Sequence, residues 1–271
     1  MFYITSNDRT KIAVYDYNPC GRKTIVLIHG WPLSHKIFEY QTQLLVNCGY
    51  RVVLLDLRGF GASDSPAGGY CYDQMAQDIY VVVRRMKLYG FVLGGFSMGG
   101  AIVLRYMRNY CGYGVRKLML LAAAAPSWTM REGFPYGNTR EDVNQLICQA
   151  MRDRPQLART FSHEQLFFSA HSDAVKDWFE DISLSASGIG TVNTAISLRD
   201  EDGRMDLCSV HVPTAIFQGA HDVVVQEELT LCQYESIPGA VLYRLECSGH
   251  GVFYDELDKF NDYMMEFLQT C

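Results

Sequence analysis

The sequence lacks the features that would assign the chain to a membrane, a nucleic acid or an export route. No apolar stretch reaches the ~18 residues that a helix needs to span a bilayer. The formal net charge is −6, and no basic block suggests a nucleic-acid-binding surface. The N-terminus has no basic region followed by an apolar run, as a secretory signal would have. We therefore expect a soluble, cytoplasmic protein with no membrane or nucleic-acid partner, and homo-oligomers are compatible with the sequence.

The nine cysteines are scattered, and no two of them form a Cys-x-x-Cys pair. An odd number at irregular spacing is more typical of reduced thiols than of a disulfide framework. Motifs of the type His-x-His or His-Glu-x-x-His are also missing, as are clusters of carboxylates along the sequence. We therefore expect neither a metal ion nor another cofactor.

What the sequence does contain is an alternation of short apolar runs and amphipathic segments. The apolar runs are typical of strands in a parallel sheet that is covered on both faces. They occupy 24–30, 52–59, 91–97, 117–125, 214–222 and 241–246, after an opening hairpin at about 2–5 and 11–17. Helical patterns lie at 73–90, 98–112 and 255–268. The alternation predicts an α/β fold with a mostly parallel central sheet and helices on both faces.

The segment 126–206 interrupts this alternation. It starts at Pro126 and is rich in Arg, Asp, Gln and aromatic residues. Short helices are expected there at 142–151, 163–170, 173–181 and 188–198. We expect one domain, with a core formed by 1–125 and 207–271 and a helical cap insertion formed by 126–206.

The heptapeptide GGFSMGG at 94–100 places two glycines on each side of a run that contains Ser97. Glycine costs backbone entropy, so four of them around one hydroxyl need a geometric reason. The pattern Gly95-x-Ser97-x-Gly99, between an apolar run and an amphipathic segment, is typical of a nucleophile elbow. In that turn the serine is exposed at the sheet edge, and the glycines let strand and helix approach closely. The alternative is a serine N-cap in a glycine-rich turn.

A serine hydroxyl is a weak nucleophile at its free pKa and needs a base. His250 lies in CSGHGVF, between the last predicted strand and the last predicted helix. His29, at a strand end beside a glycine turn, fits a hydrogen-bonded structural role better. The base in turn needs a carboxylate that fixes its tautomer. Asp222 follows the strand at 214–218, and Asp56, which ends VVLLD, is the competing acid. The chain order Ser97, Asp222, His250 favours Asp222.

An oxyanion needs backbone N–H donors. The N–H of Met98 opens the helix after Ser97, where a developing anion is stabilised. HGWP at 29–32 follows the first buried strand, and the N–H of Trp31 is free to donate because Pro32 affects only the following peptide. We therefore expect Trp31 and Met98 to form an oxyanion hole.

These pieces together resemble the α/β-hydrolase superfamily, and more narrowly the esterases known as non-haem chloroperoxidases or perhydrolases. The matching segments are HGWPLS, DLRGFGASDSP, YDQMAQDI, GFSMGGAIVLRYM, VPTAIFQGAHDVVV and SGHGVFYDELDKFNDYMMEFL. The resemblance implies the α/β-hydrolase fold, the triad Ser97, Asp222 and His250, hydrolysis of esters with small acyl groups, and peroxyacid formation in many members. Two departures stand out: the family's Gly-Asp-x-Asp is Gly-Ala-His-Asp at 219–222, and the cap shows little match.

The substrate pocket is expected to be apolar. Candidate lining residues are Phe96, Trp128, Phe253 and Trp178, and Trp31 is a further candidate wall. Such a pocket favours small-molecule esters with small or aromatic acyl groups. A carbon–carbon bond hydrolase of the same fold is the nearest alternative; it would need a cation for its acidic substrate, and Arg152, Arg154 or Arg159 could supply one. A ligand receptor that retains the triad is a further alternative.

Overall fold

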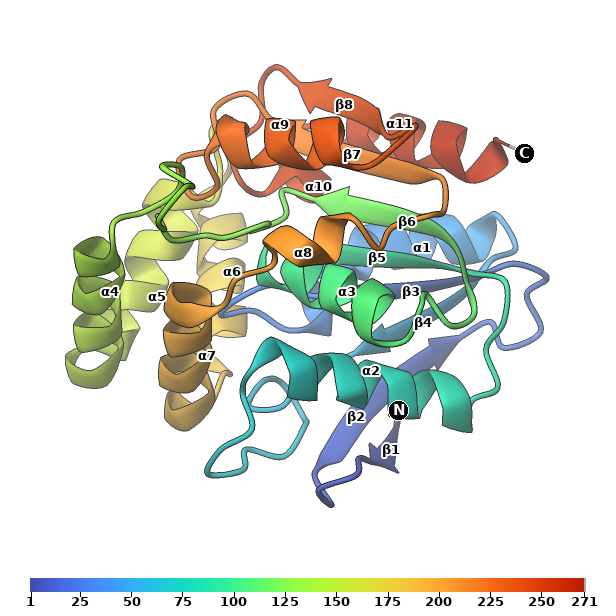
Figure 1. The fold of residues 1–271 in the computed structure, drawn as a ribbon, viewed down its shortest axis with the longest axis horizontal. Coiled ribbons are helices and arrows are strands. Elements are labelled where there is room, and N and C mark those ends of the chain that lie inside the picture. The colour runs from blue at the N-terminus through green and yellow to red at the C-terminus, as the bar shows by residue number, and fades with distance from the viewer. Residues whose placement is uncertain (271) are drawn as a thin grey trace.

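The computed structural model describes residues 1–270, which build one eight-stranded sheet (Figure 1). The strands are β1 (Phe2–Thr5), β2 (Lys11–Tyr17), β3 (Thr24–Ile28), β4 (Arg51–Leu55), β5 (Phe91–Phe96), β6 (Val115–Leu121), β7 (Thr214–Gly219) and β8 (Val241–Leu245). Their order is β1-β2-β4-β3-β5-β6-β7-β8. Strand β2 pairs antiparallel with both of its neighbours, whereas the remaining pairs are parallel. Every strand predicted from the sequence is present, and the predicted mostly parallel sheet is confirmed.

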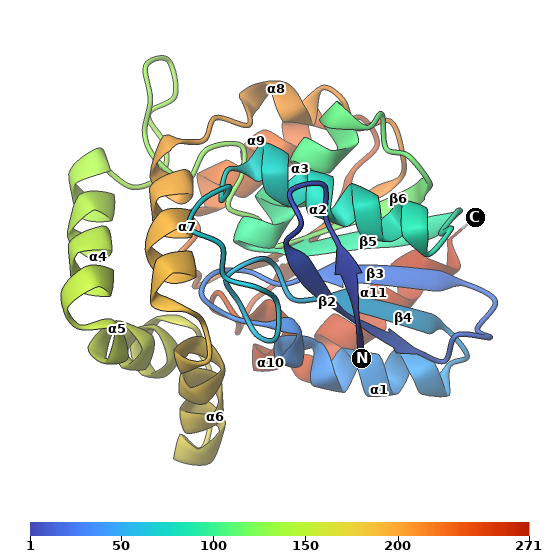
Figure 2. The ribbon, with the colours of Figure 1, turned by 90° about the horizontal axis from the view of Figure 1, so that it is seen from below.

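Helices cover both faces of this sheet (Figure 2). They are α1 (Glu39–Asn47), α2 (Tyr72–Arg85), α3 (Met98–Asn109), α9 (Glu227–Ser236), α10 (Val252–Asp255) and α11 (Leu257–Gln269), with a 3-10 turn η1 (His35–Phe38) before α1. The predicted last helix is split into α10 and α11. Helices α1 and α9 were not predicted, because their buried faces include polar residues, such as Gln41 in α1 and Gln233 in α9, which blur the apolar period.

Two apolar cores lie on the two faces of the sheet. In β3, Val26 and Ile28 belong to the core under α2 and α3, whereas Ile25 and Leu27 belong to the core under α1 and α11. Successive side chains of a strand point to opposite faces, so a strand buried on both sides reads as a continuous apolar run. This is why the strands could be located from the sequence.

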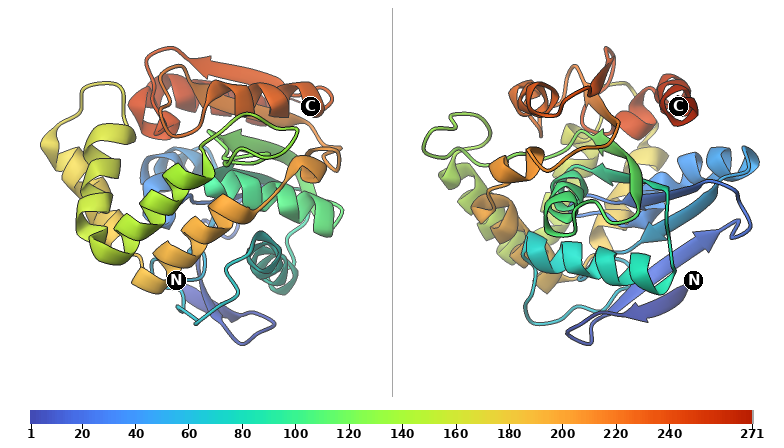
Figure 3. Two further views of the ribbon diagram at one scale, coloured as in Figure 1. Left: turned by 60° about the vertical axis from the view of Figure 1, so that its left-hand side comes forward. Right: turned by 45° about the vertical axis from the view of Figure 1, so that its right-hand side comes forward.

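The cap segment 126–206 adds helices at the end of the sheet to which the parallel strands point (Figures 1 and 3). They are α4 (Arg140–Arg152), α5 (Arg154–Thr160), a π-helical turn η2 (Phe161–Gln165), α6 (Asp173–Leu184) and α7 (Gly188–Asp200). The short helix α8 (Arg204–Leu207) follows and lies beside α3 (Figure 1). None of the helices within residues 1–270 is long and apolar enough to cross a membrane.

Three of the four predicted cap helices are present, but the helix predicted at 163–170 is wrong. Helix formation starts earlier, because Asp153 caps the N-terminus of α5 and Pro155 occupies its first turn. The residues after Gln165 leave the helix. Their backbone N–H groups at Phe168 and Ser169 donate to the carboxylate of Asp255 instead of to helical carbonyls. This long-range partner was not visible in the sequence.

Candidate active site

Ser97 lies on a strained turn between β5 and α3. Its backbone has φ 52° and ψ −120°, a conformation that residues other than glycine rarely adopt. A Cβ at Gly95 would collide with the backbone of Gly99, and a Cβ at Gly99 would collide with the backbone carbonyl of His29. A Cβ at Gly100 would meet the Cβ of Ala123. The glycines therefore permit the close packing of strand, helix and neighbouring loop that this turn requires.

His250 and Asp222 form a buried pair. The Nδ1 atom of His250 lies 2.8 Å from Oδ2 of Asp222, and both side chains are fully buried. The Nε2 atom of His250 is also buried, and it has no hydrogen-bond partner among the described residues. The imidazole ring packs against the ring of Phe96, the residue directly before Ser97, with the ring centroids 4.7 Å apart. A histidine fixed through Nδ1, with Nε2 free to accept, has the arrangement of a general base.

The two candidate acids are used differently. Oδ1 of Asp222 accepts the N–H groups of Val224 and Val225, both at 2.8 Å, so its second oxygen is aimed at His250. Asp56 lies elsewhere: its carboxylate accepts from the ring and the backbone of His35, from Tyr15 and from Ala62.

Burial raises the pKa of Asp56, but the hydrogen bonds, chiefly from His35, outweigh that effect and lower it. Asp56 therefore stabilises the loop after β4.

The segment that carries Trp31 is held beside Ser97. A Cβ at Gly30 would lie 2.8 Å from the Cβ of Ser97, so the chain passes the nucleophile closely there. Among the described residues, neither the N–H of Trp31 nor that of Met98 donates to a protein acceptor. Both N–H groups are therefore available to an anion.

His29 orders this loop. Its Nδ1 lies 2.8 Å from the carbonyl of Gly30, and its Nε2 accepts from the N–H of Leu57 at 2.9 Å. An imidazole that accepts through Nε2 and donates through Nδ1 is neutral. Burial lowers the pKa of His29 to about 4, which keeps it neutral at physiological pH. His29 thus has the structural role expected from the sequence.

A cavity of about 160 Å³ opens onto Ser97 between the sheet and the cap. Its apolar lining is Trp31, Trp128, Val143, Leu146, Phe161, Leu198, Val223 and Val224, and its polar lining, besides Ser97, is Asn138, Asp142 and Gln165. The two tryptophans are fixed in place, because the indole of Trp31 donates to the carbonyl of Thr191 and that of Trp128 to the carbonyl of Val224. Of the predicted walls, Trp31 and Trp128 are present.

Three predicted pocket residues do not line this cavity. Phe96 and Phe253 are fully buried and pack on each other, with their ring centroids 4.9 Å apart. Trp178 packs against Tyr40 and Phe179 and is not part of the lining. The sequence showed that these residues were aromatic but not which way they faced. The cap residues that do line the cavity, such as Leu146 and Phe161, were missed; the apolar period of α4 was the one signal for Leu146.

The charges of the cavity are informative about its ligands. Among the described residues, Asp142 is the one charged residue of the lining, and no Lys or Arg side chain contributes to it. Two of the arginines considered in the sequence are engaged elsewhere: Arg154 donates to the carbonyl of Leu184, and Arg159 pairs with Glu180. Arg152 is exposed at the end of α4 and is not part of the lining.

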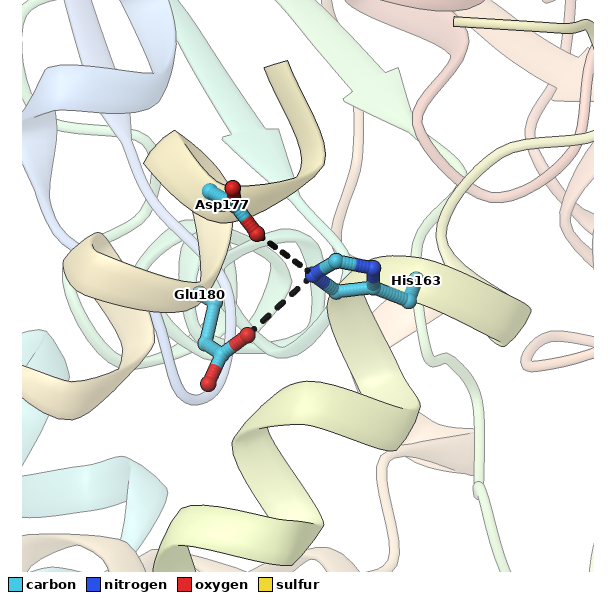
Figure 4. Close-up of side chains that lie close together, drawn as sticks. All are labelled: His163, Asp177 and Glu180. Carbon is cyan, nitrogen blue, oxygen red and sulfur yellow. Dashed lines mark ion pairs between the residues drawn. The ribbon is translucent and has the colours of Figure 1, made fainter. Parts of the chain in front are cut away.

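One group of potential metal ligands lies in the cap (Figure 4). Nε2 of His163 lies 3.2 Å from a carboxylate oxygen of Asp177 and 3.1 Å from one of Glu180. The group is not visible in the sequence, because its side chains come from two separate elements, η2 and α6. The same oxygen of Glu180 also lies 3.1 Å from the guanidinium of Arg159. Since Arg159 already supplies the positive charge, we interpret the group as an ion-pair network that ties η2 to α6.

Comparisons with known proteins agree with this architecture. Residues 23–257 match the family model described as alpha/beta hydrolase fold. The chain is 40% identical over 265 residues to the AB hydrolase superfamily protein YisY of Bacillus subtilis (strain 168), covering 98% of each chain. It is 31% identical to a putative non-heme chloroperoxidase of Synechocystis sp. (strain ATCC 27184 / PCC 6803 / Kazusa), covering 99% of this chain and 100% of the relative. Among solved structures, an esterase from Exiguobacterium antarcticum superposes with a TM-score of 0.95 at 42% identity, covering 99% of each chain.

Proposed function

This chain belongs to the alpha/beta hydrolase fold family, and from that premise we propose that it is a serine carboxylesterase with Ser97 as nucleophile. The observation that carries the proposal is the buried pair of His250 and Asp222, which has a free Nε2 and whose imidazole packs against Phe96, the residue directly before Ser97 and its strained turn. A serine N-cap would need neither the strain nor the base. The similarity to an esterase and to a protein named as a chloroperoxidase supports the same reaction class.

In the proposed mechanism, Nε2 of His250 takes the proton of Ser97 as its Oγ attacks the ester carbonyl. Asp222 holds the imidazole in the tautomer that accepts through Nε2 and stabilises the imidazolium that forms. The N–H groups of Trp31 and Met98 hold the oxyanion; one such donor typically contributes about 10²–10³ in turnover. His250 then protonates the leaving alcohol, and water attacks the acyl-enzyme. Hydrogen peroxide in place of water would give a peroxyacid.

The cavity supports short or compact acyl groups. Its volume of about 160 Å³ and its largely apolar walls suit a small aliphatic or aromatic acyl group. A carbon–carbon bond hydrolase would bind an acidic substrate, and the one charge in the lining, Asp142, would repel it. Small neutral esters therefore fit the site better than anionic substrates.

The proposal is tested with p-nitrophenyl esters from acetyl to dodecanoyl, measured as kcat/KM for the wild type and for Ser97→Ala. We expect turnover that peaks at short acyl chains, labelling of the wild type by a fluorophosphonate probe, and loss of both in the variant. A triad serine contributes on the order of 10⁶ in turnover. Labelling without ester turnover would indicate a carbon–carbon hydrolase or a receptor, and absence of labelling would refute Ser97 as nucleophile. Adding hydrogen peroxide to the best substrate then tests peroxyacid formation.

A further inference from the structure

Asp255, at the end of α10, is a fully buried carboxylate with four hydrogen-bond donors. One oxygen accepts the backbone N–H groups of Gly249 and Phe168, both at 2.7 Å. The other accepts the N–H of Ser169 at 3.0 Å and lies 2.7 Å from Nε2 of His171. A carboxylate offers about four acceptor positions, so the acceptor capacity of Asp255 is fully used.

The four donors come from two distant parts of the chain. Gly249 directly precedes His250, whereas Phe168, Ser169 and His171 lie in the cap segment between η2 and α6. One buried carboxylate therefore joins the loop of the proposed base to the cap. The reacting atoms do not include Asp255, whose contacts with the site run through the backbone of that loop.

Further contacts join the same two segments. The N–H of Gly251 donates to the carbonyl of Leu166 at 2.6 Å, and Oγ of Ser169 donates to the carbonyl of Cys247 at 2.7 Å. A Cβ at Gly249 would lie 2.9 Å from the backbone nitrogen of Phe168, which is closer than real side chains approach. The glycine before His250 thus allows the loop to lie directly against the cap.

We propose that Asp255 is a positioning residue that sets the place of His250 by clamping its loop to the cap segment 166–171. The proposal rests on the function proposed above, since positioning matters only if His250 is a base. A misplacement of about 1 Å at a reacting group costs on the order of 10²-fold in rate. The cap then does more than line the pocket, because its segment 166–171 also holds the loop of His250 in place.

The test compares Asp255→Asn with Asp258→Asn, which changes an exposed carboxylate at the start of α11. The first substitution keeps the shape of the side chain but turns an NH₂ group toward two of the donors. We expect kcat to fall by about 10- to 100-fold, with a smaller change in KM, at a protein concentration corrected for folded fraction. Asp258→Asn should match the wild type. A folded Asp255→Asn variant with wild-type kcat would overturn the proposal.

If Asp255→Asn does not fold, a second pair of variants tests whether Asp255 positions His250. His171→Leu removes one donor to Asp255, and His171→Gln retains an N–H donor on a side chain of similar reach. We expect His171→Leu to lower kcat by several-fold and His171→Gln to restore most of it. Equal kcat in both variants and in the wild type would contradict the proposal, because lost packing alone would lower stability and leave turnover per folded molecule unchanged.

Hydrogen exchange separates failure of this proposal from failure of the proposed function. In Asp255→Asn, or in His171→Leu if the first variant does not fold, loss of the clamp should speed amide exchange in 246–251 and 166–171 together, with Asp258→Asn as control. That result does not depend on turnover. Exchange that rises in neither segment would refute the clamp even in an active enzyme, and an inactive wild type would refute the function while the clamp is still measured.

Discussion

The core and the cap contribute different kinds of groups to the site. The core supplies Ser97 after β5, Asp222 after β7, His250 after β8 and the Trp31 segment after β3. These positions all follow the carboxyl ends of parallel strands, where ligands of open α/β sheets bind. The cap supplies side chains such as Leu146 and Phe161, which line the cavity. The comparison indicates that the core carries the groups of the proposed chemistry, whereas the cap contributes cavity walls and, through Asp255, contacts to the loop of His250.

The largest change in kcat that tests this difference between core and cap is expected at the two core acids, Asp222 and Asp56. Asp222→Asn should lower kcat by about 10⁴-fold, because the imidazole of His250 loses the partner that fixes its tautomer. Asp56→Asn should leave turnover per folded molecule within a few-fold and lower stability, because its partners include His35, Tyr15 and Ala62. Steady-state kinetics and denaturant unfolding of both variants make the measurement. The opposite pattern would show that Asp56 is the triad acid.

The pH dependence of stability tests the core frame at His29. The pKa of His29 in the fold is about 4 because of burial, below that of an exposed imidazole at ~6.5. The unfolded chain therefore binds this proton more readily, so the stability that neutral His29 contributes is complete above pH ~6.5 and is lost as the pH falls toward ~4.

We expect His29 to account for up to about 3 kcal/mol of that loss. Urea unfolding of the wild type and of His29→Asn at several pH values measures it. The variant should be less stable at neutral pH and should show a shallower decline in acid. Parallel curves for the two proteins would mean that His29 does not titrate in this range.

The smallest expected effect is a change in acyl-chain preference, which tests whether the cap limits the size of the cavity. Phe161→Ala should enlarge the cavity beside Ser97 and raise the ratio of kcat/KM for hexanoyl over acetyl esters by about tenfold, since a pocket discriminates each methylene by about 1–3 kcal/mol. Trp178→Ala, in the same cap but outside the cavity, is the matched control and should leave the ratio unchanged. A similar shift in both variants would indicate that the cap acts by general loosening and not through the cavity wall.

The core was the more predictable region because its signals are local. A strand buried on both faces must be apolar along its length, and the glycines around Ser97 are required by contacts that any such turn makes. Helix α9 was not predicted, because one of its buried residues, Gln233, is polar and does not look like a core residue in the sequence. Its side chain is buried because it donates to the carbonyls of Ala123 and Ala125.

The cap was less predictable because its structure depends on partners far away in the chain. The stretch after Gln165 looked helical, but Phe168 and Ser169 donate to Asp255, which is 86 or more positions later. Likewise, His163 meets Asp177 and Glu180 only because η2 packs against α6. The hydrophobic periodicity of the sequence does not encode such contacts between distant residues.

The sequence by itself determined the positions of the strands along the chain, the core helices after β4 and β5, the glycine-dependent turn at Ser97 and the candidate triad in its chain order. These features follow from burial and backbone sterics, which act over a few residues. The sequence favoured Asp222 over Asp56, and the tertiary structure shows its contact with His250. Only the tertiary structure decided that Phe96, Phe253 and Trp178 lie outside the cavity and that Asp255 joins the cap to the loop of the base. These are questions of direction and distance, which are fixed when segments far apart in the chain pack together.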